Sequence, residues 1–287
     1  MIFLKDNMKL ENIIDLNKHP IHELNSSKIK QLIEKSKNDL KEFSCCTIPN
    51  FILPRSINSM LEDLKTKINK VYWSQESINP YFSKDDPKLP KGHPKRTFTK
   101  RNNGYLNSDL FTEDSELKFL YEQKVLLNFI SKCVGISPIY RWSDPLARHA
   151  YNMMKPGHQL PWHFDSCEFT LSILIQKPEE GGIFEYCPNI REPGNENFEG
   201  VKKVLSGDLN HVRQLKIEPG DLQIFKGRFS MHRVTKIEGN QSRYLAIPTY
   251  VLDPKRVNTP EHSRVVYGRA LPIHFERDKV RSDNLID

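Results

Sequence analysis

The sequence predicts an α+β protein with a mainly β core, in which a helical N-terminal half packs on a β-rich C-terminal half. Before Gly135, apolar residues recur at three- and four-residue steps, as on the buried face of helices. After Gly135, short β-branched and aromatic runs alternate with Pro- and Gly-containing turns, as in a sandwich or barrel. Hydrophobic residues make up 37% of the 287 residues, which supports a sizeable core in one domain.

Three helices are predicted in the N-terminal half, over 25–42, 55–72 and 114–134. Pro54 precedes the second of these, as is typical of a helix start. Between the second and third helices, residues 74–105 are rich in Pro, Asp, Lys, Asn and Gly. They predict a long irregular loop, and a loop of that length in a compact domain is often functional.

The C-terminal half predicts a series of strands, among them "HAYNMM", "EFTLSILIQ", "GGIFEYC", "LQIFKG" and "SRYLAIPTYVL". Residues 188–210 interrupt this series with a polar, Gly- and Asn-rich stretch, which is interpreted as an inserted loop. No internal repeat or low-complexity tract accompanies these strands.

Charge and cysteine content limit the function classes. The net charge is +7, but the lysines alternate with acids, which indicates solvated helix faces more than a basic stripe for nucleic acid. No apolar run approaches the roughly 20 residues of a membrane span, and early charges interrupt the N-terminus. The five cysteines form no CxxC pair and are expected to be reduced thiols. A cytoplasmic location is therefore predicted.

The stretch "PWHFDSCEF" places His163 and Asp165 two residues apart, on one face of an extended segment. Alone, the pair is better explained as an ordinary hydrogen-bonded strand end. His232, in the strand-like run "SMHRVTKI", supplies a third ligand. Two histidines and one carboxylate form the facial triad that leaves open positions on Fe(II), whereas a structural zinc site is closed by four ligands.

Arg243 follows His232 by eleven residues and lies in the next predicted strand. Its guanidinium can hold the far carboxylate of a metal-chelating 2-oxo acid in a bidentate fork. A surface ion pair is the alternative, but the apolar neighbours Leu245, Ala246 and Ile247 argue against full exposure.

This pattern of HxD, distal His and Arg, over strands with "PGD…F…H", resembles the Fe(II)/2-oxoglutarate-dependent dioxygenases across residues 140–252. The stretches "WHFDSCEFTLSILIQKPEEGGIFEYCPNIR" and "HPKR" resemble the small bacterial free-amino-acid hydroxylase and radical halogenase group. The resemblance implies a double-stranded β-helix, or jelly roll, with flanking helices in one domain, 1–287. Residues 1–135 would form the helical part and pre-barrel loop, 136–252 the jelly-roll core, and 253–287 an extension packing near the active site.

The resemblance also implies roles for single residues. His163, Asp165 and His232 would bind Fe(II), Arg243 would pair with the distal carboxylate of 2-oxoglutarate, and Asn152 would help to hold this cosubstrate. With O₂, 2-oxoglutarate would become succinate and CO₂ while a substrate C–H bond is oxidised. In the family's halogenases Gly or Ala replaces the carboxylate ligand. Asp165 therefore predicts hydroxylation, or desaturation or cyclisation, and not chlorination.

A small molecule is the expected substrate, and the resemblance favours a free amino acid or similar small amine. An arginine or histidine of the pre-barrel loop would meet its carboxylate, and residues after the HxD pair would meet its amine. Each of these residues has a simpler explanation as a group that is exposed to solvent, supports the site from behind or packs in the core. The substrate-binding candidates are His93, Arg96, Arg101, Trp142, Ser166, Glu168 and Thr249.

Other functions stay open at this point. An oxygenase of the same fold acting on nucleic acid or a peptide is the nearest alternative, although no second arginine follows Arg243 on its strand and no aromatic and basic residues interleave to stack bases. A non-catalytic binding module would leave the ligand set and Arg243 without a use. A zinc or nickel hydrolase would need no 2-oxo acid.

Overall fold

The computed structural model describes residues 8–277 and 283–286. Its α-helices are α1 (Ser27–Glu42), α2 (Pro54–Thr66), α3 (Glu116–Glu122), α4 (Lys124–Val134), α5 (Phe198–Leu205), α6 (Pro260–Tyr267) and α7 (Pro272–Glu276). Short 3₁₀ helices are η2 (Leu10–Asn12), η3 (Ile68–Lys70), η4 (Pro94–Arg96) and η5 (Ser108–Leu110). The strands are β1 (Cys45–Ile48), β2 (Tyr72–Ser74), β3 (Ser77–Ile78), β4 (Thr99–Lys100), β5 (Asn103–Leu106), β6 (Tyr140–Arg141), β7 (His149–Met154), β8 (Leu160–His163), β9 (Thr170–Gln176), β10 (Glu180–Gly181), β11 (Phe184–Cys187), β12 (Arg213–Leu215), β13 (Leu222–Phe225), β14 (Met231–Val234), β15 (Ile237–Glu238), β16 (Arg243–Pro248) and β17 (Tyr250–Val251).

Two antiparallel sheets form the core of the described chain. The larger has the strand order β1-β13-β9-β16-β7-β5-β2, and the smaller the order β12-β11-β14-β8. Residues of both sheets, including Met154 from β7 and Phe184 from β11, meet in one apolar cluster. The side chains that face this cluster can therefore reach from one sheet to the other, and the ring of His232 lies beside it, near Phe184 and Phe225.

The larger sheet does not begin at residue 136. β1, β2 and β5 precede that position and pair with β13, β5 and β7. The expected boundary between a helical part (1–135) and a β core (136–252) is therefore wrong for the sheet. These pairings join segments far apart in the sequence, and local patterning does not reveal such partners.

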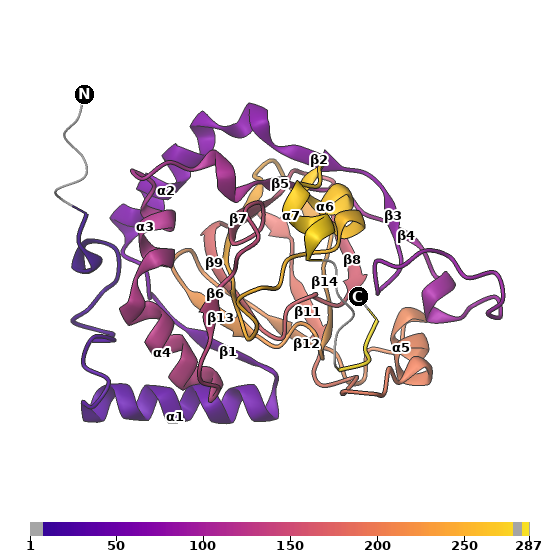
Figure 1. Cartoon of the computed structure of the whole chain (residues 1–287), viewed down its shortest axis with the longest axis horizontal. Helices are drawn as coiled ribbons and strands as arrows, with labels where there is room; N and C mark the ends of the chain where they lie inside the picture. The colour runs from indigo at the N-terminus through magenta and orange to yellow at the C-terminus, as the bar shows by residue number, and fades with distance from the viewer. Residues whose placement is uncertain (1–7, 278–282, 287) are drawn as a thin grey trace.

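Helices α1 to α4 lie together on one side of the larger sheet, as Figure 1 shows at the left of the view. The first predicted helix agrees with α1, whose buried Ile29, Ile33 and Leu40 form one face. The helix predicted over 114–134 is instead two helices, because Gln123 adopts an extended conformation between them. α3 packs on β7 and β16 whereas α4 packs on α1, so tertiary contacts impose the break.

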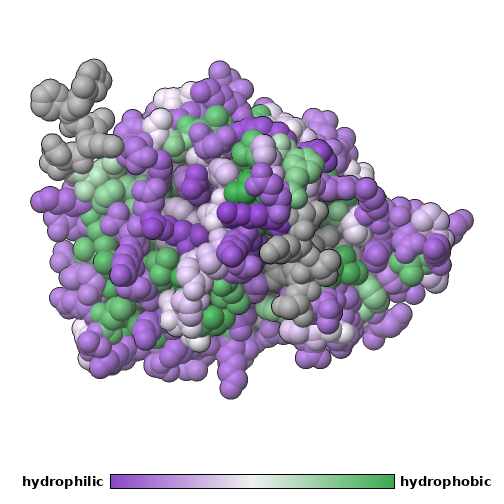
Figure 2. Space-filling model, viewed as in Figure 1, coloured by the Kyte–Doolittle hydropathy of each residue, from purple (hydrophilic) through white to green (hydrophobic). Residues whose placement is uncertain are grey.

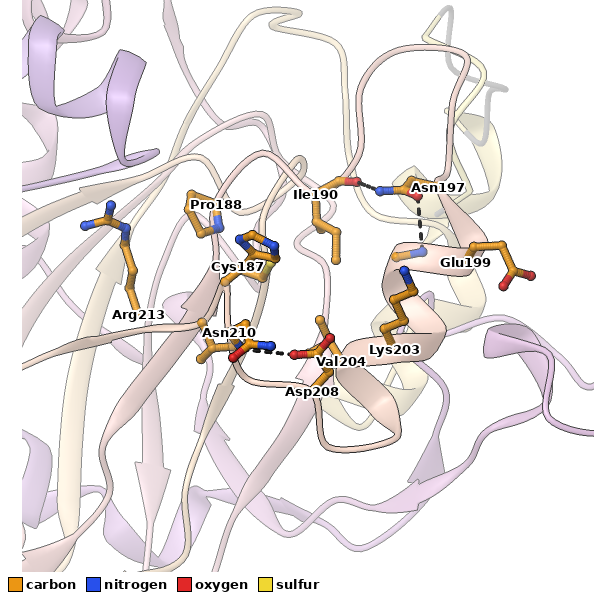
Figure 3. Close-up of a pocket in the computed structure, with 13 residues that line it drawn as sticks. Cys187, Pro188, Ile190, Asn197, Glu199, Lys203, Val204, Asp208, Asn210 and Arg213 are labelled. Carbon is orange, nitrogen blue, oxygen red and sulfur yellow. Dashed lines mark hydrogen bonds between the residues drawn. The ribbon is translucent and has the colours of Figure 1, made fainter.

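Two predicted loops contain regular structure. Residues 74–105 hold η4 and the β3–β4 pair, and they end in β5 of the larger sheet. The polar stretch 188–210 holds α5, whose Val201 and Val204 are buried. Asn197 caps α5 by accepting a hydrogen bond from the Gly200 amide, and its side-chain amide donates to the Ile190 carbonyl (Figure 3).

Hydrophilic residues dominate the face seen in Figure 2, and apolar residues appear there in separate patches. Within residues 8–277 and 283–286, no helix is both long and apolar enough to span a bilayer.

Candidate active site

The three predicted metal ligands converge at the end of the smaller sheet. His163 is the last residue of β8 and lies directly opposite His232 of β14 in the antiparallel register. Asp165 follows β8 by two residues. One potential ligand atom from each residue lies within 4.8 Å of the other two, the spacing of a shared metal ion.

Each histidine presents its Nε2 atom to the centre of this group. Asp165 Oδ1 lies 3.4 Å from His232 Nε2 and 3.9 Å from His163 Nε2. The opposite ring nitrogens face backbone carbonyls: His163 Nδ1 lies 2.8 Å from Pro161 O and His232 Nδ1 lies 3.1 Å from Ser230 O. Donation from Nδ1–H to these carbonyls leaves both Nε2 lone pairs free for a metal.

Two residues that sequence reasoning missed hold the carboxylate of Asp165. Thr170 Oγ1 donates a 2.8 Å hydrogen bond to Asp165 Oδ2. A Cβ atom added to Gly227 would lie 1.9 Å from the same oxygen, so only glycine leaves room for this carboxylate. Nothing in the "FKGRF" stretch indicates that contact, because Gly227 and Asp165 lie 62 positions apart.

The electrostatics of the three residues suit a cation. Burial, followed by the nearby His232, lowers the pKa of His163 to about 3, so this imidazole is neutral at neutral pH. Burial alone would raise the pKa of Asp165, but His232, His163 and the bond from Thr170 bring it below the ordinary carboxyl value. A neutral imidazole beside an ionised carboxylate is the form that binds a metal without first losing a proton.

Arg243 begins β16 and is 3% exposed. Its partner in the register is Met154, which packs in the apolar cluster between the sheets. Phe184 of the same cluster lies 5.5 Å, ring to ring, from His232. The Arg243 side chain also passes Gly182, where an added Cβ would lie 3.4 Å from Arg243 Cδ. Arg243 and the metal ligands therefore border one interior region.

The charge of Arg243 has no counterion in the described part of the chain. No described residue accepts a hydrogen bond from its buried Nη1, and no ion pair forms there. Burial lowers the pKa of Arg243 to about 10, which keeps the guanidinium charged at neutral pH. An isolated buried cation is costly, so the position favours binding of an anion.

Asn152 lies on β7, and Leu245 of β16 and Tyr105 of β5 flank it in the register. It is buried, and its side-chain amide interacts with the hydroxyl of the neighbouring Tyr105, which lines the inner cavity. Asn152 therefore lies directly behind the cavity wall, where its amide can orient the Tyr105 hydroxyl or contact a ligand.

An inner cavity reaches the metal ligands and contains Arg101 in its wall. Arg101 is 1% exposed and lies between the rings of Phe82 and Tyr105, at 5.7 and 5.8 Å from their centroids. Its Nε donates to Asn103, but no described residue accepts from its Nη1. Arg101 is therefore a second buried guanidinium that has no carboxylate partner in the described part of the chain.

Three further candidates lie near the site. Thr249, just after β16, lines the inner cavity. Ser166 lines both this cavity and a wider outer pocket, and its hydroxyl donates to Asn258. Glu168 lines only the outer pocket, where Oε2 lies 3.8 Å from Arg256 Nη1. Since α6 contributes His262 and Val266 to the inner cavity, the C-terminal extension reaches the site.

The remaining three candidates lie elsewhere. Arg96 makes an ion pair with Asp85 at 2.9 Å within its own loop. His93 accepts a hydrogen bond from the Lys95 amide, and its ring packs against the tilted ring of Phe198 in α5. Trp142 packs in an apolar cluster and is absent from the cavity wall. Of the positively charged residues in the stretch 84–101, Arg101 is therefore the one that lines the inner cavity.

A separate pocket lies between α5 and the ends of β11 and β12 (Figure 3). Its wall carries Lys203 and Arg213 together with Glu199 and Asp208, so its charges are of both signs. Among the described residues, the triad His163, Asp165 and His232 is the one group with metal-ligand spacing. The chemistry therefore belongs to the inner cavity.

Comparisons with known proteins agree with this architecture. The family model described as Halogenase D matches residues 90–263. No curated protein matches the sequence.

Solved structures share the fold at low sequence identity. A prolyl hydroxylase from Trichoplax adhaerens, in complex with a hypoxia-inducible-factor peptide, has a TM-score of 0.52 at 16% identity, over 78% of this chain and 91% of that one. The epimerase SnoN, in complex with Fe³⁺, α-ketoglutarate and nogalamycin RO, has a TM-score of 0.52 at 11% identity, over 77% of this chain and 84% of that one. A member of the 2OG-Fe(II) oxygenase family from Burkholderia pseudomallei has a TM-score of 0.50 at 10% identity, over 77% and 92%. The described chain therefore has the mostly antiparallel fold of these oxygenases.

Proposed function

This chain belongs to the Halogenase D family, and we propose that it is a 2-oxoglutarate-dependent oxygenase that uses Fe(II) and O₂ to hydroxylate an unactivated C–H bond of a free amino acid or similar small amine. Asp165 is the observation that carries the choice of reaction, because its carboxylate completes a set of three ligands. The two sheets are interpreted as the walls of a double-stranded β-helix.

The residues present suit both the metal and the cosubstrate. His163, Asp165 and His232 would hold Fe(II), which, with O₂ and 2-oxoglutarate, supplies the oxidising power for C–H cleavage. Arg243 would neutralise the distal carboxylate of 2-oxoglutarate, and Asn152 would donate a hydrogen bond from the same wall. The apolar cluster beside them excludes water, which strengthens these interactions.

Arg101 would bind the carboxylate of the amino acid. Arg101 is buried, lies between aromatic rings, and has an Nη1 atom with no acceptor among the described residues. It therefore offers a positively charged site for an anion in the same cavity as the metal ligands. Thr249 and Ser166 offer hydroxyl groups on the wall of that cavity. A bidentate contact to Arg101 would fix the substrate so that one carbon faces the metal.

Hydroxylation is favoured over halogenation by how Asp165 is held. A halide ligand would need the coordination position that this carboxylate fills. Thr170 and Gly227 fit the carboxylate closely, so the surroundings match an aspartate at this position. The family description alone would favour halogen transfer, and Asp165 reverses that expectation.

The test is a succinate-release screen of the purified protein with Fe(II), 2-oxoglutarate, chloride and a panel of free amino acids, followed by mass analysis. We expect amino-acid-dependent succinate release and a product that gains one oxygen. A product that loses two hydrogens would indicate desaturation or cyclisation. A chlorinated product would contradict the proposed reaction.

Arg101→Met serves as the matched variant for the substrate site. We expect the KM for the amino acid to rise about 100-fold while the affinity for 2-oxoglutarate is retained, because one charge-assisted contact is lost. If only a peptide or an oligonucleotide stimulates succinate release, the substrate is that polymer and not a free amino acid.

A further inference from the structure

Phe82 lies at the boundary between the inner cavity and the outer pocket. It lines both spaces, together with Ser166 and His262. The inner cavity has a volume of about 80 Å³, and the outer pocket has a volume of about 900 Å³. The Phe82 ring therefore lies where the small space that reaches the metal ligands meets the larger one.

Three side chains of the site surround this ring. The His163 ring lies 5.7 Å away, centroid to centroid, in an edge-to-face arrangement. The Arg101 guanidinium lies 5.7 Å from the Phe82 centroid, and an aromatic face attracts a cation at this distance. The tilted ring of His262 in α6 lies 5.1 Å away. Phe82 therefore contacts a metal ligand, the proposed carboxylate-binding arginine and the C-terminal extension at once.

The backbone under the ring is held in an unusual conformation. Phe82 has a φ of 54°, in the left-handed region that a bulky residue rarely adopts. The fully buried Asn79 fixes this turn: its Oδ1 accepts from the amides of Tyr81 and Ser83, and its Nδ2 donates to the carbonyls of Ser83 and Lys95. Such a conformation persists only where the surroundings impose it, and it is frequent at functional sites.

The ring also covers the apolar side of the inner cavity. Phe82 packs against a cluster that includes Ala147, Cys167 and Val266, and these three residues line the cavity. Cys167 is 3% exposed. Because thiol reagents react according to exposure, Cys167 reports whether the cavity is closed to solvent.

We propose that Phe82 is a positioning residue that separates the inner cavity from the outer pocket and holds the Arg101 guanidinium in place. The second role rests on the proposed function, because it assumes that Arg101 binds the substrate carboxylate. Water that the ring excludes cannot weaken the electrostatic contacts inside the cavity. Since Asn79 fixes the backbone, rotation of the ring about its side-chain bonds admits a ligand and then restores the separation.

Alkylation of Cys167 by iodoacetamide tests the separation in the ligand-free, full-length protein, with peptide mass analysis to locate the modified thiol. We expect Phe82→Ala to raise the rate at Cys167 at least about tenfold, because the cavity opens to the outer pocket. Cys133 of α4, fully buried in the main apolar cluster, is the internal control and should change less than about twofold.

Two outcomes of this measurement would overturn the separation. An unchanged rate at Cys167 would mean that the ring closes nothing. An equal rise at Cys167 and Cys133 would mean that the substitution loosens the whole protein. If Phe82→Ala does not fold, His262→Ala opens the same boundary from α6, with the same expected result and the same contradicting outcomes.

Phe82→Leu and Phe82→Tyr form a matched pair for the contact with Arg101. Leucine fills much of the space without an aromatic face, whereas tyrosine keeps the ring. Calorimetry measures binding of the amino acid that releases most succinate in the screen, to protein loaded with Zn(II) and 2-oxoglutarate. We expect the Kd to rise about fivefold in Phe82→Leu and less than about twofold in Phe82→Tyr. Equal values in the two variants would contradict the role of the ring in holding Arg101.

Failure of the proposed function gives a different result from failure of this inference. If no amino acid binds or is turned over but Phe82→Ala exposes Cys167, the proposed substrate is wrong and the separation stands. If amino acids are turned over but Cys167 does not respond, the separation is wrong and the proposed function stands.

Discussion

Two regions of the molecule contain buried arginines, and they differ in whether a carboxylate pairs with the guanidinium. At the face that joins α5 to the C-terminal residues, Arg191 and Arg228 are fully buried and each has a carboxylate partner: Arg191 Nη1 lies 2.8 Å from Glu196 Oε2, and Arg228 pairs with Asp283. In the interior that borders the metal ligands, Arg101 and Arg243 are equally buried, but no described carboxylate pairs with either.

The difference separates structural cations from ligand-binding ones. A buried ion pair completed within the chain stabilises the fold only while both partners remain. A buried cation that the chain leaves unpaired lowers stability, and an anion that binds there recovers the lost interaction. The two classes should therefore respond in opposite ways to the same substitution of arginine by methionine.

The largest effect is expected for Arg243→Met. Loss of the only described cation at the cosubstrate position should raise the Kd for 2-oxoglutarate on the order of 1,000-fold, since a buried charge-assisted contact disappears. The free energy of unfolding of the ligand-free protein should stay unchanged or rise, because an unpaired buried charge is removed. Calorimetric titration with 2-oxoglutarate and urea unfolding measure the two quantities.

Arg243→Lys is the matched control for this prediction. Lysine keeps the charge but lacks the planar fork, so it should recover part of the affinity. A methionine variant that binds 2-oxoglutarate normally would contradict the assignment of Arg243 and remove the contrast between the two regions.

Arg191→Met should act mainly on stability. Its removal leaves Glu196 mostly buried, at 10% side-chain exposure, without its ion-pair partner. We expect a loss of about 3 kcal/mol in the free energy of unfolding, with the Kd for 2-oxoglutarate unchanged. Arg96→Met, which breaks the exposed pair with Asp85, should lose no more than about 1 kcal/mol. A similar small loss in both variants would show that burial of the pair is unimportant.

The sequence predicted three metal ligands, and the structure brings these three residues together. The alternation of a strand places His163 and Asp165 together, and a strand register brings His232 opposite His163. Arg243 was predicted from its spacing, and the structure places it in the expected interior. The structure adds the absence of a described partner, which no sequence pattern reveals.

Other features depend on contacts between distant segments. Gly227 lies close to Asp165, and β1 joins the larger sheet through β13, although long stretches of chain separate these partners. His93 and Arg96 had the residue types of a substrate site, but their loop contacts itself and α5. Residue type alone could not distinguish them from Arg101, which differs in being buried in the wall of the inner cavity.

The smallest expected effect concerns His149, a buried histidine that has no role at the proposed ligand sites of Arg101 and Arg243. Neither ring nitrogen has a partner among the described residues, and the ring packs near Tyr121 at 5.2 Å. Burial, with Arg148 and Lys118, lowers the pKa of His149 to about 3 from an ordinary value of 6.5. The unfolded chain therefore binds a proton as the pH falls below about 6.5, while the folded protein does not.

This proton uptake should make His149 contribute its stability fully above about pH 6.5 and lose it progressively as the pH falls towards about 3. The loss at pH 5, relative to pH 7.5, should be about 2 kcal/mol for this residue. His149→Phe keeps an aromatic ring and cannot be protonated, so the fall in unfolding free energy between these two pH values should shrink by that amount. Urea unfolding at both pH values measures it, with the exposed His22→Gln as control. An unchanged pH dependence in His149→Phe would mean that the imidazole is charged in the folded protein and has an acceptor, which would place it with the paired cations.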